Sequence, residues 1–195
     1  MRKFIKLPEP IKNGSISVEQ AIAARRSRRD FLSKHLTDSQ IGQLAWAAQG
    51  LDSKTGHRNA PSAGATYPLE LYVVNCDGLF HYLPEKHSLE LLDYAELRPL
   101  LARAALEQKF LEDAPLTIII AGCFARTTDY YGNRGVGFVY MEAGHAAQNI
   151  HLQAEALGLG SVAVGAFEGE AVKQVLSLPA NIEPLYLIPV GYYRE

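Results

Sequence analysis

Apolar residues recur along the chain with two different periods, which predict strands and helices respectively. The stretch 116–122 is almost continuously apolar, which is typical of a strand covered on both faces. Runs rich in β-branched and aromatic residues predict further strands, two of which form a hairpin. These runs are 69–74 with 78–83 for the hairpin, then 162–166 and 185–190.

Helices are predicted where apolar residues recur at intervals of three and four. Two of them start at capping boxes, in which a hydroxyl residue is followed three positions later by glutamine: Ser17 with Gln20, and Thr37 with Gln40. They end near Arg25 and Gly50. Further helices are predicted over 97–110, 135–157 and 168–176. The helix 135–157 is rich in alanine and glycine, so we expect it to be central or to pack closely against a twin.

Strands mixed with helices in this order predict an α+β fold, with a mixed β-sheet flanked by helices. No internal repeat and no long linker divides the 195 residues. We therefore expect a single domain over residues 1–195, in which residues 1–15 form an extended N-terminal arm.

The composition indicates in which compartment the protein works and which kinds of partner it does not favour. The two cysteines, Cys76 and Cys123, lack CxxC spacing, which favours a reducing cytoplasm over a disulfide framework or a thiolate zinc site. A formal net charge of −2 favours neither nucleic acid nor an anionic membrane as partner. No apolar run approaches the roughly 20 residues that cross a bilayer. A cytoplasmic protein is expected.

The most unusual segment is Arg25-Arg26-Ser27-Arg28-Arg29, directly after the first predicted helix. Guanidinium groups bind phosphate oxygens in a bidentate manner and the hydroxyl adds a donor, so the segment suits a phosphate or a polyol phosphate. A solvated basic turn, or a patch that binds a partner protein, explains the same residues equally well.

Other chemistries find weaker support. Gly158-Leu159-Gly160 lies between a predicted helix and a predicted strand, the reverse of the dinucleotide-binding order. Glu142 and His145 have a metal-ligating spacing without a second such pair, so we expect no metal site and a buried, hydrogen-bonded His145. The Gly-x-Ser-x-Gly pattern of a hydrolase nucleophile is absent from the sequence.

Four ordered blocks together resemble the FMN-dependent nitroreductase superfamily: residues 25–31, 60–68, 142–149 and 154–161. The second and third blocks look most like the SagB-type dehydrogenase branch, which includes azoline oxidases that aromatise thiazoline and oxazoline rings in modified peptides. The resemblance implies a nitroreductase-like α+β fold and an obligate homodimer with two flavins between the subunits. The long central helix would then lie at the dimer interface.

The resemblance also implies which residues hold FMN. Arg25, Arg26, Ser27 and Arg29 would bind its phosphate, its ribityl chain and its pyrimidine edge. Arg194 would make a further contact with the phosphate. The isoalloxazine ring is bordered, often across the dimer interface, by two segments of small residues. These are Pro61, Ser62, Ala63 and Gly64, and then Ala163, Val164, Gly165 and Ala166.

The chain departs from the family pattern at two places. Many nitroreductases have asparagine where this chain has Ala65, so one flavin contact is missing. Azoline oxidases carry a Lys-Tyr pair ahead of the long helix, where this chain has Tyr130-Tyr131. An ordinary tyrosine is a weak base at neutral pH, which argues against ring oxidation. Tyr131 is the candidate catalytic residue, as a hydrogen-bond donor to the substrate.

These observations predict an FMN-dependent oxidoreductase that passes electrons from NAD(P)H through the bound flavin to a small, electron-poor organic acceptor. Three alternatives stay open. One is a SagB-type flavin oxidase that acts on a peptide-derived substrate. Another is a flavin-binding module without turnover. The last is a structural domain whose arginines bind an acidic protein.

Overall fold

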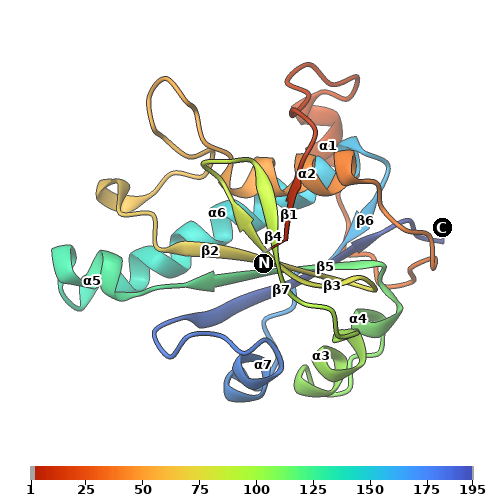
Figure 1. Ribbon diagram of the computed structural model, residues 1–195. Helices are drawn as coiled ribbons and strands as arrows, with labels where there is room; N and C mark the ends of the chain where they lie inside the picture. Colours follow the sequence, from red (N-terminus) through yellow and green to blue (C-terminus); the bar gives the residue numbers. More distant parts are fainter. Residues whose placement is uncertain (1–2, 195) are drawn as a thin grey trace.

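The computed structural model describes residues 3–194 and places helices on both faces of one sheet (Figure 1). The sheet has seven strands in the order β1-β4-β3-β2-β5-β7-β6. The strands are β1 Phe4–Lys6, β2 Leu69–Asn75, β3 Gly78–Leu83, β4 Ser88–Asp93, β5 Leu116–Gly122, β6 Gly160–Ser161 and β7 Glu183–Gly191. The helices are α1 Val18–Ala24, α2 Asp38–Gln49, η1 Ala63–Ala65, α3 Arg98–Ala104, α4 Phe110–Asp113, α5 Ala125–Tyr131, α6 Arg134–Ala156 and α7 Gly169–Val175.

The α+β class predicted from the sequence is confirmed. All pairs of named strands run antiparallel, and the parallel component of the sheet is an isolated bridge between Ser27 and Ser161. The predicted N-terminal arm is extended and adds β1 to the edge of the sheet beside β4. No helix among residues 3–194 is both long and apolar enough to cross a membrane.

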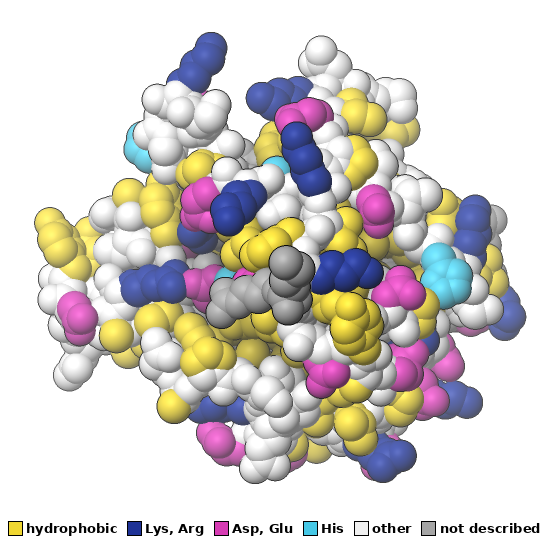
Figure 2. Space-filling view, in the orientation of Figure 1, with side chains coloured by type: hydrophobic (Ala, Val, Ile, Leu, Met, Phe, Trp, Pro, Cys, Tyr) yellow, Lys and Arg dark blue, Asp and Glu magenta, His cyan; other side chains and the backbone are white. Residues whose placement is uncertain are grey.

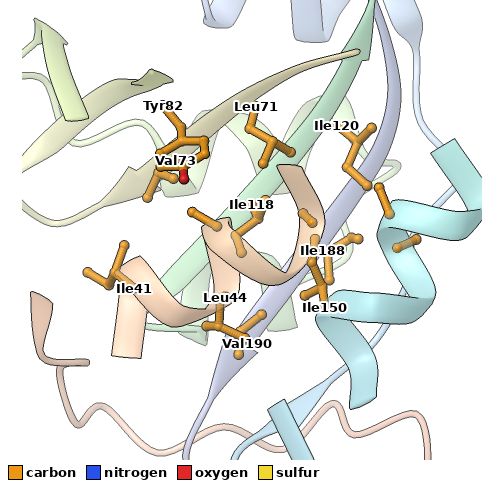
Figure 3. Packing of buried hydrophobic residues seen from close by; sticks show 14 of the residues in the cluster. Ile41, Leu44, Leu71, Val73, Tyr82, Ile118, Ile120, Ile150, Ile188 and Val190 are labelled. Atoms are coloured by element: carbon orange, nitrogen blue, oxygen red, sulfur yellow. The ribbon is translucent and has the colours of Figure 1, made fainter. Parts of the chain in front are cut away.

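Strand β5 lies inside the sheet, between β2 and β7, and is buried at every position, as its unbroken apolar sequence predicts. Alternate side chains enter two separate cores. Ile118 and Ile120 point towards α2 and α6, where they meet Leu71 of β2 and Ile150 of α6 (Figure 3). Ile119 points to the opposite core, formed with α3, α4 and α7. Two helical layers are therefore needed to keep β5 out of water.

The ends of most helices agree with the local sequence. Both predicted capping boxes are present, and in each the hydroxyl accepts the backbone N–H of the glutamine. Helix α6 occupies 134–156, and α7 has Glu168 and Leu176 as its capping residues. Helix α5, strand β1 and strand β4 have no counterpart in the sequence prediction.

The single helix predicted over 97–110 is wrong. Helix α3 ends at Ala104, and the short helix α4 begins at Phe110. Between them, Leu106 and Glu107 have φ values of 59° and 58°. Two consecutive residues in the left-handed region cannot continue a right-handed helix.

The strand predicted over 162–166 is also largely absent. Strand β6 stops at Ser161. Further along, the backbone N–H of Val162 donates to the Pro189 carbonyl at 3.4 Å, and Val164 exchanges both backbone hydrogen bonds with Leu187. Between these two points Val162 faces Pro189, whose nitrogen carries no hydrogen to donate. The ladder is therefore interrupted, and the chain leaves the sheet after Val164.

Charged side chains of both signs are interspersed on the face shown in Figure 2, among scattered apolar side chains. This mixture agrees with the small net charge of the sequence. Any concentration of positive charge must therefore be local.

Replacement of Ile120 tests the importance of the core between the sheet and α6. Ile120→Ala should lower the free energy of unfolding by about 2–5 kcal/mol, because the removed methyl groups leave a cavity in a fully buried site. Chemical denaturation measures this loss. Leu92→Ala is the control, because Leu92 is a strand residue that is 48% exposed, and its replacement should cost roughly 0.5 kcal/mol or less. Equal losses would contradict this description of the core.

Candidate functional site

The arginine-rich segment leaves the end of α1 and is held against the C-terminal end of α6. The backbone N–H of Arg26 donates to Glu155 Oε1 at 3.3 Å. Ser27 forms a bridge with Ser161, and the backbone N–H of Arg28 donates to the Ser161 carbonyl at 3.0 Å. Ser161 thus links the segment to β6 and, through β6, to the sheet.

The structure brings the predicted phosphate-binding residues together at this end of the molecule. Arg194 follows Tyr193, which bridges to Phe31, and its backbone N–H donates to the Asp30 carbonyl at 3.0 Å. We call this group the arginine cluster: Arg25, Arg26, Ser27, Arg29 and Arg194. Ser27, Arg29 and Arg194 are exposed, and Arg25 is half-buried.

The guanidinium groups of the segment are not equivalent. Arg26 Nη1 donates to the carbonyls of Ala23 and Arg25, at 2.9 and 2.7 Å, and so closes the end of α1. Arg28 turns inward and lies over the Tyr193 ring, 4.6 Å from its centre. Gly160 allows this packing, because a Cβ there would lie 2.7 Å from Arg28 Cβ. Arg29 lies over the Phe110 ring, 5.7 Å from its centre, and Arg194 Nη1 forms an exposed ion pair with Asp30 Oδ1 at 3.8 Å. Exposed contacts of this kind are weak, so Arg25, Arg29 and Arg194 are the arginines that can turn to an anion.

A buried histidine lies behind the arginine cluster. His151 of α6 is 6% exposed, and its Nδ1 shares a 2.6 Å hydrogen bond with Ser161 Oγ. Burial, together with the positive charge of Arg25, lowers the pKa of His151 from 6.5 to about 4. His151 is therefore neutral near neutral pH and adds no charge to the cluster. It supports Ser161 through a hydrogen bond instead.

The second predicted flavin-contacting segment, 163–166, continues from Ser161 along the edge of the sheet. Ala163, Gly165 and Ala166 are exposed, whereas the Val164 side chain is buried among the helices of the opposite layer. The structure therefore places this segment beside the arginine cluster. Three of its four residues offer small, open surface to a flat ligand.

The other predicted segment, Pro61 to Gly64, lies at the opposite end of α6, beside α5. Gly64 packs against Tyr131, so closely that a Cβ on Gly64 would lie 2.7 Å from the Tyr131 hydroxyl. Tyr131 is also flanked by the rings of Tyr130 and Phe138, at 4.7 and 5.2 Å between centres. We call the residues 61–64 together with Tyr131 the loop cluster.

A buried carboxyl group lies beneath the loop cluster. Glu142 of α6 is 2% exposed and has no hydrogen-bond partner at Oε1. Burial raises the pKa of Glu142 to about 7, against the smaller opposing effects of Ser62 and Arg58. A substantial part of the Glu142 population is therefore protonated near neutral pH.

The two clusters cannot lie close to each other within one chain. The loop cluster rests on α6 at Glu142, and the arginine cluster rests on it at Glu155. At a rise of about 1.5 Å per residue, these two levels of the helix are roughly 20 Å apart. Figure 1 shows the same separation, with α5 at one end of α6 and β6 near the other.

Most small residues of α6 serve the interior of the chain. Ala143, Ala146, Ala147 and Ala154 are buried in the core against the sheet and α2. Gly137 and Gly144 differ, because a Cβ at either position would meet nothing within 4 Å. The alanines therefore pack inside the subunit. The predicted dimer interface can involve only the open face of α6 that carries these two glycines.

The prediction that His145 is buried is wrong. His145 is exposed, whereas His151, two turns further along α6, is buried. The sequence does indicate that His151 is buried, because it follows Ala143, Ala147 and Ile150 on the apolar face of the helix. Ser161 was also missed, because its contacts join distant parts of the sequence.

A cavity of about 610 Å³ has none of the predicted flavin-contacting residues in its lining. It lies between the N-terminal arm, α2 and the C-terminal half of α6, and Trp46, Gln43 and Gln153 are among its lining residues. The Gln43 amide accepts a hydrogen bond from the backbone N–H of Ile11 and donates to the Ile11 carbonyl and to Gln153 Oε1. Its side-chain amide is therefore already hydrogen-bonded to other residues of the chain.

Comparison with known proteins identifies the family. The model of the nitroreductase family matches residues 22–192, which include both clusters except Arg194. A relative from Methanocaldococcus jannaschii, named as a nitroreductase, is 43% identical over 182 residues, covering 90% of this chain and 91% of the relative. The chain belongs to the nitroreductase family.

Solved structures agree with this membership. A protein from Ralstonia eutropha, also named as a nitroreductase, is 29% identical, with a TM-score of 0.89 over 98% of this chain and 90% of that one. The NADPH:FMN oxidoreductase of Vibrio harveyi, solved with NAD+, is 22% identical and has a TM-score of 0.69, over 91% and 69%. The nitroreductase fold and a general oxidoreductase function, both predicted from the sequence, are thus confirmed, while the SagB-type branch stays a prediction.

The buried His151 predicts acid sensitivity of this nitroreductase-family protein. Its pKa is lower in the folded chain than in the unfolded one, so the unfolded chain binds more protons between about pH 6.5 and 4, and stability falls as the pH falls through that range. The loss at pH 4 should be on the order of 3 kcal/mol.

Denaturation of His151→Asn and of the unchanged protein at several pH values measures this effect. The difference between the two free energies of unfolding should change progressively below pH 6.5. His57→Asn, at an exposed loop position, controls for the removal of an imidazole. Parallel pH profiles for His151→Asn and the unchanged protein would show that His151 does not carry the effect.

Proposed function

We propose that the protein is an FMN-dependent oxidoreductase that accepts electrons from NAD(P)H and passes them to a small, electron-poor organic acceptor. The observation that carries the proposal is the arginine cluster directly beside the open surface of small residues at 163–166. This arrangement suits a ligand with an anionic phosphate at one end and a flat ring at the other. The fold shared with the FMN oxidoreductase of Vibrio harveyi supports it.

The residues present fit FMN. Arg25, Arg29 and Arg194 supply guanidinium groups for the phosphate, Arg194 by giving up its exposed 3.8 Å contact with Asp30, and the exposed Ser27 hydroxyl adds a donor. The exposed Gly165 leaves room for backbone to approach a ring. When bound, FMN supplies hydride chemistry that no side chain of the chain provides.

A second copy of the chain completes the proposed site. The two clusters lie roughly 20 Å apart along α6, so a ring bordered by both must receive them from different subunits. The exposed face of α6 carries Tyr140 and Met141 beside the open glycines, 57% and 62% exposed, which gives it apolar surface to bury. A two-fold homodimer then forms two identical sites.

The protein's own groups bind, orient and stabilise charge in this proposal. A guanidinium near the pyrimidine edge stabilises the negative charge that develops when electrons enter the ring. The nicotinamide and the acceptor bind one after the other at the same open face of the site, so no separate nucleotide-binding domain is required. Tyr131, held in place by Gly64 and Phe138, donates a hydrogen bond to the acceptor.

The spectrum of the purified protein tests the proposal, before and after anaerobic addition of NADH or NADPH. Bound FMN that is bleached by a pyridine nucleotide supports it. FMN that stays oxidised with both nucleotides but is reduced by a modified peptide would favour the SagB-type oxidase. Protein that is colourless and does not take up FMN would overturn the proposal.

Loss of one guanidinium should weaken binding of FMN. A charge-assisted hydrogen bond contributes about 1.5–3 kcal/mol, so Arg25→Ala should raise the Kd for FMN roughly ten- to hundredfold. Fluorescence quenching during titration of the flavin-free protein measures the Kd. Arg103→Ala removes an exposed arginine of α3 on the other face of the sheet and should leave the Kd unchanged. Equal Kd values for Arg25→Ala and Arg103→Ala would mean that Arg25 does not hold the phosphate.

Mixing two damaged subunits tests whether the site is shared. The double variant Arg25→Ala/Arg29→Ala disables the arginine cluster, and Gly64→Val disables the loop cluster, because valine tolerates neither the φ of 58° nor the contact with Tyr131. Each variant alone should be inactive. Heterodimers carry one intact site, so an equal mixture refolded together should recover about a quarter of the wild-type activity. No recovery would mean that each site uses one chain only.

A further inference from the structure

The two parts of the loop cluster come from different elements of the fold. Residues 61–64 belong to the loop that precedes β2, whereas Tyr131 ends α5. These residues are half-buried or exposed, and Gly64 meets Tyr131 through a packing contact. The position of the loop relative to α5 must therefore be fixed elsewhere, and the polar contacts at the start of α5 show how.

Arg126, in the first turn of α5, links the loop to the sheet. Its Nη1 donates to the Tyr67 carbonyl at 3.0 Å, and its Nη2 donates to Glu70 Oε1 of β2, with which it forms an ion pair. Two nitrogens of one planar guanidinium thus bind a loop carbonyl and a strand carboxylate at the same time. This single side chain joins the helix, the loop and the strand.

Glu70 is also held from its other side. Its Oε2 shares a 2.7 Å hydrogen bond with His81 Nε2 of β3, and the His81 ring stacks on Tyr72, with 4.9 Å between the ring centres. Burial acts to raise the pKa of Glu70, but the hydrogen bonds from His81 and Arg126 outweigh it and lower the pKa below its ordinary value. Glu70 is therefore a carboxylate at neutral pH, and it gives Arg126 a charged partner in a fixed place.

The next residue of α5 contacts the middle of the loop. Thr66 Oγ1 donates to the Ala63 carbonyl at 3.0 Å and lies 2.8 Å from Thr127 Oγ1. Because Thr66 has one hydroxyl hydrogen and uses it on Ala63, Thr127 is the donor of the second hydrogen bond. Thr127 is 1% exposed, so this bond takes the place of one to water. Two successive residues of α5 therefore hold the loop.

The backbone of the loop is strained where these contacts act. Gly64, Ala65 and Tyr67 have φ values of 58°, 53° and 47°. Residues other than glycine adopt this left-handed region at an energetic cost, and they keep it where surrounding contacts fix them. Ser62 Oγ accepts the backbone N–H of Tyr67 at 2.9 Å, while Arg126 binds the carbonyl of the same residue. Of these two contacts, the one with Arg126 comes from outside the loop.

We propose that Arg126 is a positioning residue of the loop cluster. Its guanidinium, anchored on Glu70, holds the Tyr67 carbonyl and thereby keeps residues 61–64 packed against Tyr131. Without this guanidinium the strained loop relaxes, and the contact between Gly64 and Tyr131 opens. The consequence for a bound ring rests on the proposed function, but the role of Arg126 in the loop does not.

In the proposed reaction, Arg126 acts on the acceptor through Tyr131. A displaced loop removes the support of Tyr131, and a misplacement of about 1 Å can cost up to roughly a hundredfold in rate. In FMN-loaded protein, Arg126→Ala should therefore lower kcat/KM for the acceptor roughly ten- to hundredfold. The rate of reduction by NAD(P)H should fall much less, because Tyr131 donates to the acceptor. A general loss of folded protein would lower both rates equally.

The backbone amide of Gly64 reports on the loop directly and needs no bound flavin. Its NMR signal can be read in glycine-labelled protein as isolated and assigned by its loss in Gly64→Ala. We expect Arg126→Ala to shift this signal, while Gly14 and Gly158, which lie far from the loop, keep theirs. Arg103→Ala removes an exposed arginine of α3 and should leave all three signals in place.

Added guanidinium ion distinguishes the missing contact from a general loss of stability. The Arg126 side chain is 40% exposed, so in Arg126→Ala the ion can enter between Glu70 and the Tyr67 carbonyl. At millimolar concentration, well below denaturing levels, it should return the Gly64 signal towards its original position, whereas equal sodium chloride should not. Arg126→Lys keeps the charge but lacks the paired nitrogens, so its Gly64 signal should stay displaced.

An unchanged Gly64 signal in Arg126→Ala would overturn the proposal, as would equal recovery with sodium chloride. Should Arg126→Ala not fold, Arg126→Lys decides, because a displaced signal supports the proposal and an unchanged one overturns it. A signal that is displaced and then recovered by guanidinium, in a protein that binds no FMN, would uphold the role of Arg126 and reject the proposed function alone.

Discussion

The packing of α6 on the central strands determines where the two clusters lie. Its buried face is built largely from alanines, which let the helix approach the sheet closely over most of its length. A helix supported in this way cannot bend to bring its ends together. The clusters therefore keep a separation of roughly 20 Å, and a ligand that touches both must do so between two copies of the chain. The proposed homodimer is thus a consequence of how one subunit is packed.

Much of the fold was predictable because the relevant signals are local. The capping boxes at Ser17 and Thr37 need only four consecutive residues to form. Strand β5 was predicted with its observed bounds, since an unbroken apolar run can be covered only by two layers. The arginine segment was also recognisable, because its residue types alone indicate anion binding. These features depend little on what lies beside them in space.

The errors arose where distant residues determine the local structure. Pro189 interrupts the strand predicted over 162–166, although it belongs to a different part of the sequence. Leu106 and Glu107 adopt left-handed conformations without a glycine to mark the turn. Likewise, which face of α6 is buried decides between His145 and His151, and that choice depends on how the helix is placed on the sheet. The division of the site into two clusters follows from the same placement, which no single motif encodes.

Burial gives the two ends of α6 a common electrostatic property. Desolvation raises the pKa of Glu142 to about 7 and lowers that of His151 to about 4. Between these values the uncharged forms of both groups dominate, so neither places a fixed charge beneath its cluster. The exposed guanidinium groups then supply the charge of the proposed site, and its sign is positive.

This sign suits the proposed chemistry. Binding of a phosphate and addition of electrons to a ring both bring negative charge into the site. A carboxylate at Glu142 would oppose that charge from the loop side, at short range and with little screening because it is buried. Burial, which favours the protonated form of Glu142, therefore weakens this opposition.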